Sequence, residues 1–336
     1  MPDFPRNQNP GHGRGFSWRA PTTTGGSAKI AHSPVDIPPM RILLVPTALA
    51  LVLAACQHTA PIDRSAAPPA GAAGADDNLN AVLWMQSSAE YRAVAMQTYR
   101  AASDQLDAAL ADPAWDALAP AERGNPTAGL PPAVILDVDE TVLDNSPYQA
   151  RLVRNGTEYA SATWAGWVAE RNATAIPGVV EFARAANARG VTLVYITNRT
   201  EPMQADTLAN LRAVGLPVAD DSVFLGKGTP VEGCEQADSG DKTCRRQLAG
   251  RQYRVLMQFG DQLGDFVRIE PNTVAAHDAV LDRHGAWFGR RWWMLPNPSY
   301  GDWQAALFDN DWGRDAGGRR EAKRAALNVA SPPAPH

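Results

Sequence analysis

The stretch AVILDVDETVLDNS, residues 133–146, joins an apolar run to a cluster of acidic residues. Its first four residues follow two prolines and are all apolar, which is typical of an inner strand of a sheet covered on both faces. The acidic residues that follow are Asp137, Asp139, Glu140 and Asp144. Like charges at the mouth of a buried strand cost free energy unless a cation or a reacting group compensates them. The stretch therefore indicates a functional site at the end of this strand.

The composition of the whole chain is that of an ordinary globular protein. Of its 336 residues, 45% are hydrophobic and 20% are charged. The net charge is −5 and no long stripe of lysine or arginine is present, which argues against binding to a nucleic-acid polymer. The histidines are scattered and lack the spacing of zinc ligands.

The N-terminal part of the chain has the features of export and tether segments. Residues 1–39 precede a better start at Met40 and are interpreted as a non-native or disordered extension. Residues 40–55 combine a positive start, an apolar stretch and small residues, the shape of a secretory signal peptide. The sequence LAAC ending at Cys56 resembles a bacterial lipobox, so lipidation at Cys56 is expected, with a plain signal peptide as the alternative. Residues 56–78 predict a flexible tether.

Beyond the tether, predicted strands alternate with predicted helices. Strands are expected at 133–136, 191–197, 222–226 and 254–261. Helices are expected as one or two between Leu79 and Leu110, as pieces within 146–176, and at 177–188, 202–214 and 243–251. This alternation predicts an α/β fold with a doubly wound, mainly parallel, Rossmann-like sheet. The domain is expected to span residues 79–310, and residues 311–336 are interpreted as a partly disordered tail.

Polar side chains follow each predicted strand, at the edge where parallel sheets bind ligands. These residues are Asp137 with Asp139, Thr197 with Asn198, Lys227 or Lys242, and Asp261 with Asp265. An aspartate can attack phosphorus, and a second carboxyl group can protonate the leaving oxygen and then activate water. Carboxylate oxygens suit Mg²⁺, while hydroxyl, amide and ammonium groups can orient phosphoryl oxygens. The pattern predicts phosphoryl transfer.

The motifs DVDET (137–141), DNSPYQA (144–150), ITNR (196–199) and GDQLGDF (260–266) resemble those of the haloacid dehalogenase superfamily. They most closely resemble its class C acid phosphatases, which are bacterial lipoprotein phosphomonoesterases and 5′-nucleotidases. The likeness runs from about Trp84 to Trp303 and implies a small helical cap, formed by residues 146–176 with the N-terminal helices. It also implies Asp137 as the nucleophile and Asp139 as the general acid and base.

The resemblance further implies a set of ligands for metal and substrate. Mg²⁺ would be bound by the Asp137 carboxylate, the Asp139 backbone carbonyl and Asp261, with Asp265 supporting these ligands. Thr197, Asn198 and a lysine would contact the phosphate. The family pattern of a lysine followed by serine or threonine at a helix start matches Lys242 and favours it over Lys227.

Two aromatic residues, Trp164 and Tyr300, are expected to bind the substrate, because the family has aromatic residues at matching places. Stacking on a nucleobase would favour nucleoside 5′-monophosphates, including nicotinamide mononucleotide, over small alkyl phosphates. Packing in the core is the alternative for such residues. Two alternative functions are a phosphatase that acts on another small phosphomonoester and a non-catalytic surface lipoprotein with the same fold.

Cysteine usage and the residue after Cys56 bear on the compartment. In an exported protein, Cys234 and Cys244 are expected to form a short-range disulfide. Gln57 after Cys56 resembles Gram-negative lipoproteins anchored to the outer membrane, so the protein is expected there, facing the periplasm or the cell surface. A homodimer is left open.

The sequence DRHGAW (282–287) resembles the start of a histidine acid phosphatase signature, but its expected next residues are absent, and His284 is interpreted as a surface or packing residue.

Overall fold

The computed structural model describes residues 77–234 and 240–330. Cys56, the signal peptide, the preceding extension and nearly all of the tether lie outside these residues. The α-helices described are α1 (Leu79–Ser87), α2 (Ala89–Ala111), α3 (Ser146–Asn155), α4 (Ser161–Glu170), α5 (Val179–Ala188), α6 (Gln204–Ala213), α7 (Thr243–Gln252), α8 (Val274–His284), α9 (Asp302–Ala305) and α10 (Ala316–Ala325). None of the helices in these ranges is long and apolar enough to cross a membrane.

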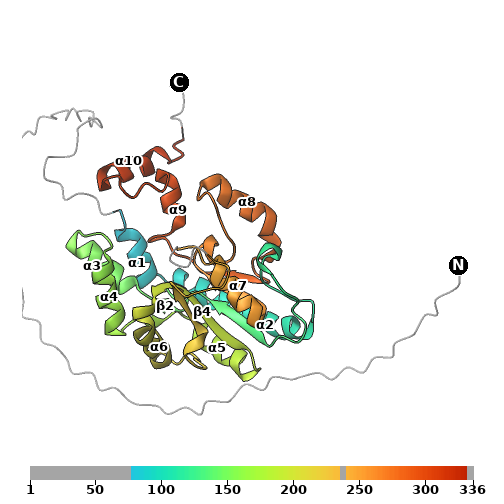
Figure 1. Ribbon diagram of the computed structural model, residues 1–336. Helices are drawn as coiled ribbons and strands as arrows, with labels where there is room; N and C mark the ends of the chain where they lie inside the picture. Colours follow the sequence, from blue (N-terminus) through green and yellow to red (C-terminus); the bar gives the residue numbers. More distant parts are fainter. Residues whose placement is uncertain (1–76, 235–239, 331–336) are drawn as a thin grey trace, which may run out of the picture. The chain divides into compact units, whose positions relative to one another are not determined.

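A parallel five-stranded sheet forms the centre of the fold (Figure 1). Its strands are β1 (Pro132–Leu136), β4 (Thr192–Thr200), β5 (Phe224–Lys227), β6 (Arg254–Gly260) and β7 (Trp292–Met294). They lie in the order β5-β4-β1-β6-β7, and every neighbouring pair is parallel. The predicted α/β fold is therefore confirmed.

The strands alternate between two apolar layers, as the pleat of a β-strand requires. In β1, Val134 and Leu136 belong to one buried cluster, while Ala133 and Ile135 belong to the other. Helices α2, α5 and α6 contribute buried residues to the first cluster, and α7 and α8 contribute to the second. The sheet is thus covered on both faces, which explains why its central strands are predominantly apolar.

The chain passes from β1 to β4 and β5 on one side, and then returns to β6 and β7 on the other. Strand order therefore reverses between β1 and β6, where ligands of doubly wound sheets bind at the carboxyl ends of the strands. Asp137 directly follows β1, and Asp261 directly follows β6. The topology alone brings these two aspartates to one crevice.

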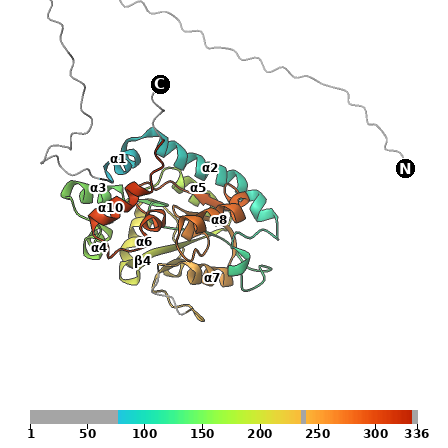
Figure 2. The same cartoon turned by 90° about the horizontal axis from the view of Figure 1, so that it is seen from above.

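The segment between β1 and α5 adds two helices, and its buried residues Tyr148 and Trp167 join the first apolar cluster. Helices α3 and α4 lie beside each other in both views (Figures 1 and 2). Two short antiparallel strands, β2 (Leu143–Asp144) and β3 (Thr174–Ala175), pair with each other at the two ends of this segment. This arrangement fits the helical pieces expected at 146–176.

Several elements were not anticipated. Strand β7 has only three residues, too few to show a period in the sequence. Helix α8 also lay outside the predicted elements. The tail expected from residue 311 onward contains α10, a helix without a single buried residue. Apolar periodicity cannot reveal such a helix.

Candidate active site

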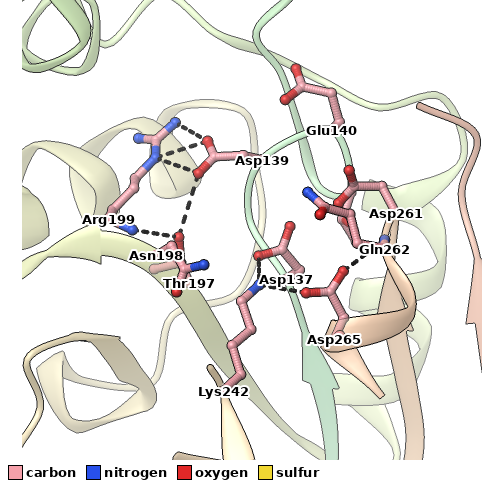
Figure 3. A network of polar contacts seen from close by, with 12 residues as sticks. Asp137, Asp139, Glu140, Thr197, Asn198, Arg199, Lys242, Asp261, Gln262 and Asp265 are labelled. Carbon is pink, nitrogen blue, oxygen red and sulfur yellow. Dashed lines mark hydrogen bonds and ion pairs between the residues drawn. The ribbon is translucent and has the colours of Figure 1, made fainter. Parts of the chain in front are cut away.

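Asp137 lies at the end of the central strand and is buried. Its backbone N–H donates to the Phe259 carbonyl at 2.9 Å, which extends the β1–β6 pairing to this residue. The Lys242 ammonium lies between Asp137 and Asp265: it contacts Asp137 Oδ1 and lies 2.6 Å from Asp265 Oδ1 (Figure 3). Lys242 immediately precedes α7, whose first backbone N–H donates to Asp241. The start of α7 therefore delivers the lysine to the end of β1.

Three buried carboxylates meet at this point. One oxygen from each of Asp137, Asp261 and Asp265 lies within 4.8 Å of the others. Burial raises the pKa of Asp137 to about 7, although Lys242 opposes the shift. Burial and the charge of Asp265 also raise the pKa of Asp261 well above its usual range. One ammonium does not balance three carboxylates, so the cluster favours a further cation.

Neutral hydrogen-bond donors hold two of these carboxylates in place. Asn297 donates to Asp261 Oδ2 at 2.9 Å, and the Gln262 backbone N–H donates to Asp265 Oδ2 at 2.9 Å. Gly260 leaves no room for a side chain, because a Cβ there would lie 2.3 Å from Asp265. These contacts hold the carboxylates in one orientation, as a preformed metal site requires.

The Asp139 carboxylate points away from this cluster, towards Arg199 (Figure 3). Arg199 Nη2 and Nε lie 2.7 and 3.0 Å from Asp139 Oδ1, and Asn145 Nδ2 lies 2.9 Å from the same oxygen. The Arg199 side chain is only 1% exposed. Asp139 is therefore held by a buried guanidinium, and its side chain remains apart from the three metal-type carboxylates.

Thr197 and Asn198 lie on the adjoining strand β4, next to Asp139. Thr197 Oγ1 accepts from the Arg199 backbone N–H at 3.1 Å and lies 3.5 Å from Asp139 Oδ2. Arg245 of α7 donates to the Thr197 carbonyl and to Asn198 Oδ1, the latter at 2.8 Å. Of the two predicted phosphate ligands on β4, Asn198 lines the cavity described below, whereas the Thr197 side chain is fully buried.

A cavity of about 1250 Å³ opens over these residues and is lined by Asp137, Asp139, Lys242, Asp261 and Asp265. Both predicted aromatic residues, Trp164 and Tyr300, also line it. The Trp164 ring meets Tyr148 edge-on at 5.1 Å between centroids, and the Arg199 guanidinium lies 5.4 Å from the Trp164 centroid. Lys227, the alternative lysine, is not among the lining residues.

Tyr300 has a role that its sequence context did not indicate. Its hydroxyl donates to the carboxylate of Glu140, which is fully buried and has a φ of 58°. The Asn145 backbone N–H donates to the other oxygen of Glu140 at 2.7 Å. Tyr300 therefore connects the segment after β7 to the acidic loop after β1.

The predicted disulfide between Cys234 and Cys244 is present. Cys244 lies in the first turn of α7, two residues after Lys242. The bond therefore anchors the helix start that carries the lysine. Residues 235–239 of the bridged loop are not described.

His284 is remote from this chemistry. Its ring lies 4.8 Å from Trp292 and 5.5 Å from Trp287, and it does not line the cavity. Packing explains it, as interpreted from the sequence.

Arg199, Glu140, Asn145 and Arg245 are polar residues of the site to which the sequence assigned no role. Arg199 follows Asn198 directly in the ITNR motif, and that position was its one available signal. Glu140 and Arg245 were hidden because partners of theirs are distant in sequence, such as Tyr300 for Glu140 and Thr197 for Arg245. Asn145 contacts Asp139 and Glu140, which lie close to it in sequence, but no local pattern marks these contacts.

Comparison with known proteins identifies the family of the chain. Residues 53–303 match the family described as HAD superfamily, subfamily IIIB (acid phosphatase). The class C acid phosphatase from Bacillus anthracis is 31% identical, with a TM-score of 0.65 over 76% of this chain and 98% of that one. Its structure with tungstate bound gives a TM-score of 0.66 at the same identity and coverage.

More distant relatives include plant proteins with other names. A stem 28 kDa glycoprotein of Glycine max is 26% identical over 40% of this chain and 52% of its own length. Vegetative storage protein 1 of Arabidopsis thaliana is 24% identical over 49% of this chain and 54% of its own length. The chain thus spans about half the length of these curated relatives. With its α/β sheet, its buried aspartates and a family match over most of its length, the chain belongs to the acid phosphatases of HAD subfamily IIIB.

Proposed function

We propose that the protein is a Mg²⁺-dependent acid phosphatase that hydrolyses nucleoside 5′-monophosphates through an aspartyl-phosphate on Asp137. The observation that carries the proposal is the position of Asp137, buried at the end of β1 beside Lys242 on the floor of the cavity. Lys242 can neutralise a phosphoryl oxygen there, which is the main catalytic task in phosphoryl transfer.

In the first step, an Asp137 carboxylate oxygen attacks phosphorus while the bond from phosphorus to the ester oxygen breaks. The Asp139 carboxyl group gives a proton to the departing oxygen, so that an alcohol leaves. In the second step, Asp139 takes a proton from water as that water attacks phosphorus, the bond to Asp137 breaks, and inorganic phosphate is released. Arg199 and Asn145 hold Asp139 in one orientation for both steps. Asn198 lines the cavity and can orient the phosphoryl group.

The residues present fit a hard divalent cation. Asp137, Asp261 and Asp265 supply oxygen ligands only, and their buried charge exceeds that of Lys242. Asp137 and Asp261 would hold Mg²⁺ directly with the Asp139 backbone carbonyl, and Asp265 would support them. When bound, the cation would neutralise charge on the phosphoryl oxygens.

Nucleotides are the proposed substrates because aromatic residues line the cavity beyond the aspartates. A base stacked on Trp164 or Tyr300 gains about 1–3 kcal/mol, without reading the edge of the base. Weak discrimination among bases is expected, and nicotinamide mononucleotide falls within this substrate class. Another phosphomonoester is the alternative. A non-catalytic role is disfavoured by the presence of both Asp137 and Asp139.

We also propose export and lipidation at Cys56, with an anchor in the outer membrane. The support is the lipobox-like sequence ending at Cys56 and the disulfide, which is typical of an oxidising compartment. Wild-type protein should sediment with membranes, and Cys56→Ser should release it or block its processing. Wild type recovered wholly in the soluble periplasmic fraction would argue for a plain signal peptide.

The test of the activity is phosphate release by the purified protein from a panel of monoesters, with Mg²⁺ and with EDTA. Nucleoside 5′-monophosphates, nicotinamide mononucleotide, a small alkyl phosphate and a small aryl phosphate make up the panel. Nucleotides should be hydrolysed best, and EDTA should abolish release until Mg²⁺ is restored. No release from any monoester would contradict the phosphatase assignment. Release confined to non-nucleotide esters would contradict only the nucleotidase part.

A further inference from the structure

Helix α10 presents one basic face to the cavity that contains the catalytic aspartates. Ala316, Arg319, Arg320 and Lys323 all line this cavity. Their spacing of three, four and seven residues places them on a single face of the helix. Arg324 lies outside the lining residues and is 3.8 Å from Glu321. The helix therefore brings three cationic side chains to the cavity and leaves another basic residue outside it.

These cations do not belong to the apolar core. None of the residues of α10 is buried, so the helix contributes no side chain to the apolar core. It is held instead by polar contacts with two other residues that line the cavity: Arg319 donates to Glu158 in the loop between α3 and α4, and Arg320 lies 2.9 Å from Asp77. In Figures 1 and 2, α10 lies on the side of the sheet that carries α1 and α3. Two of the three cations, Arg319 and Arg320, thus also anchor the helix through these ion pairs.

At least two of the three cations can accept an anionic ligand. Lys323 has no ion pair with any residue of the ranges 77–234 and 240–330. Burial lowers its pKa, so an anionic neighbour would favour its charged form. The Arg319 side chain is 11% exposed, but its Glu158 partner is 71% exposed, and solvent screens an ion pair whose carboxylate is exposed. A ligand anion can therefore compete for both residues.

The cavity is larger than a mononucleotide needs. Its volume of about 1250 Å³ exceeds the roughly 300–1,000 Å³ that is usual for small-molecule sites. Its two charged regions differ in sign: the aspartate cluster lies at the end of β1 and β6, and the cations lie on α10. The scissile phosphate binds at the aspartates, which leaves the basic face for a different group of the same molecule.

We propose that Arg319, Arg320 and Lys323 form a second anion subsite, which selects phosphomonoesters that carry another phosphate group at the far end of the molecule. The inference rests on the proposed function, because the subsite acts on substrates held at Asp137. Bisphosphates of suitable length would bridge the cavity. Monophosphates would leave the basic face empty.

The experiment compares α,ω-alkanediol bisphosphates of increasing chain length with the matched ω-hydroxyalkyl monophosphates. The measured quantity is the ratio of their kcat/KM values, corrected for the two scissile groups of the bisphosphate. Wild type should prefer the bisphosphate by about tenfold at one range of chain lengths, and added salt should reduce this preference. The triple variant Arg319→Gln/Arg320→Gln/Lys323→Gln should bring the ratio close to one.

Two further variants make the result specific. Lys323→Gln removes a cation without breaking an ion pair within the described ranges, so a reduced ratio cannot reflect a disrupted contact. Arg324→Gln removes the same charge from the same helix outside the cavity and should keep the wild-type ratio. If the triple variant does not fold, Lys323→Gln alone tests the subsite. Its ratio of kcat/KM for the bisphosphate to kcat/KM for the monophosphate should be about threefold below that of wild type.

The outcomes separate this inference from the proposed function. Normal monophosphate hydrolysis with a ratio of one at every chain length would overturn the subsite and leave the phosphatase intact. Absence of hydrolysis of the monophosphates, the bisphosphates and the nucleotides alike would overturn both. A ratio unchanged in the triple variant, together with reduced binding to phosphatidylglycerol vesicles, would make the basic face a membrane contact and overturn the subsite.

Discussion

Replacing Lys242 by methionine removes the proposed phosphate ligand and a buried countercharge in one step. The Lys242 side chain is 7% exposed, contacts Asp137 and lies 2.6 Å from Asp265 Oδ1. At this distance and an effective dielectric constant of about 20, the attraction to Asp265 is about 6 kcal/mol before desolvation is counted. Removing one partner of a buried pair typically costs about 3–5 kcal/mol net. Lys227→Met is the matched control, because Lys227 does not line the cavity.

We expect Lys242→Met to lower the free energy of unfolding by about 3–5 kcal/mol in EDTA, measured by urea unfolding. The loss should be smaller in Mg²⁺, since a divalent cation compensates the same carboxylates. The value of kcat/KM should fall by about 10²–10³-fold, as for loss of one charge-stabilising donor. Lys227→Met should change either quantity only slightly. Wild-type kcat/KM in Lys242→Met, or equal losses in the two variants, would refute the assignment of Lys242.

The aromatic residues and the disulfide give three further predictions. Trp164→Ala should raise KM about tenfold for nucleotides and far less for a small aryl phosphate, and equal increases for both would count against base stacking. Tyr300→Ala should likewise raise KM for nucleotides far more than for a small aryl phosphate. Tyr300→Phe should keep the nucleotide KM but lower the free energy of unfolding by about 1–3 kcal/mol, because buried Glu140 loses a hydrogen-bond donor. An unchanged free energy of unfolding in urea would contradict this role of the Tyr300 hydroxyl. The double variant Cys234→Ser/Cys244→Ser should lower the free energy of unfolding by about 2–3 kcal/mol. It should also raise KM, because the start of α7 that carries Lys242 is no longer anchored. Two reactive thiols in the non-reduced wild type would contradict the disulfide.

The central sheet could be predicted because its strands have a strong and simple signal. β1 and β6 are buried on both faces and therefore appear as apolar runs ending in aspartate. Parallel pairing then brings the residues after the strands to one edge, so the proximity of Asp137 and Asp261 follows from the fold class. Lys242 could be predicted only through the family resemblance, since nothing in its own segment distinguishes it from Lys227.

The remaining parts of the site depend on contacts that no local pattern encodes. Arg199 holds Asp139 from 60 residues away, and Tyr300 reaches Glu140 across 160 residues. Both contacts require the tertiary structure to be known first. Helix α10 escaped prediction for another reason: it buries no apolar face, and its position is set by ion pairs with Glu158 and Asp77.

The most direct test of the account is to identify the residue that becomes phosphorylated during turnover. The protein is mixed with a nucleoside 5′-monophosphate and Mg²⁺, quenched in acid within one turnover, reduced with borohydride and analysed by peptide mass spectrometry. Borohydride reduces an aspartyl-phosphate to homoserine, so the account predicts homoserine at position 137, and none in Asp137→Asn. Homoserine at another position, or full turnover by Asp137→Asn with normal metal content, would contradict it.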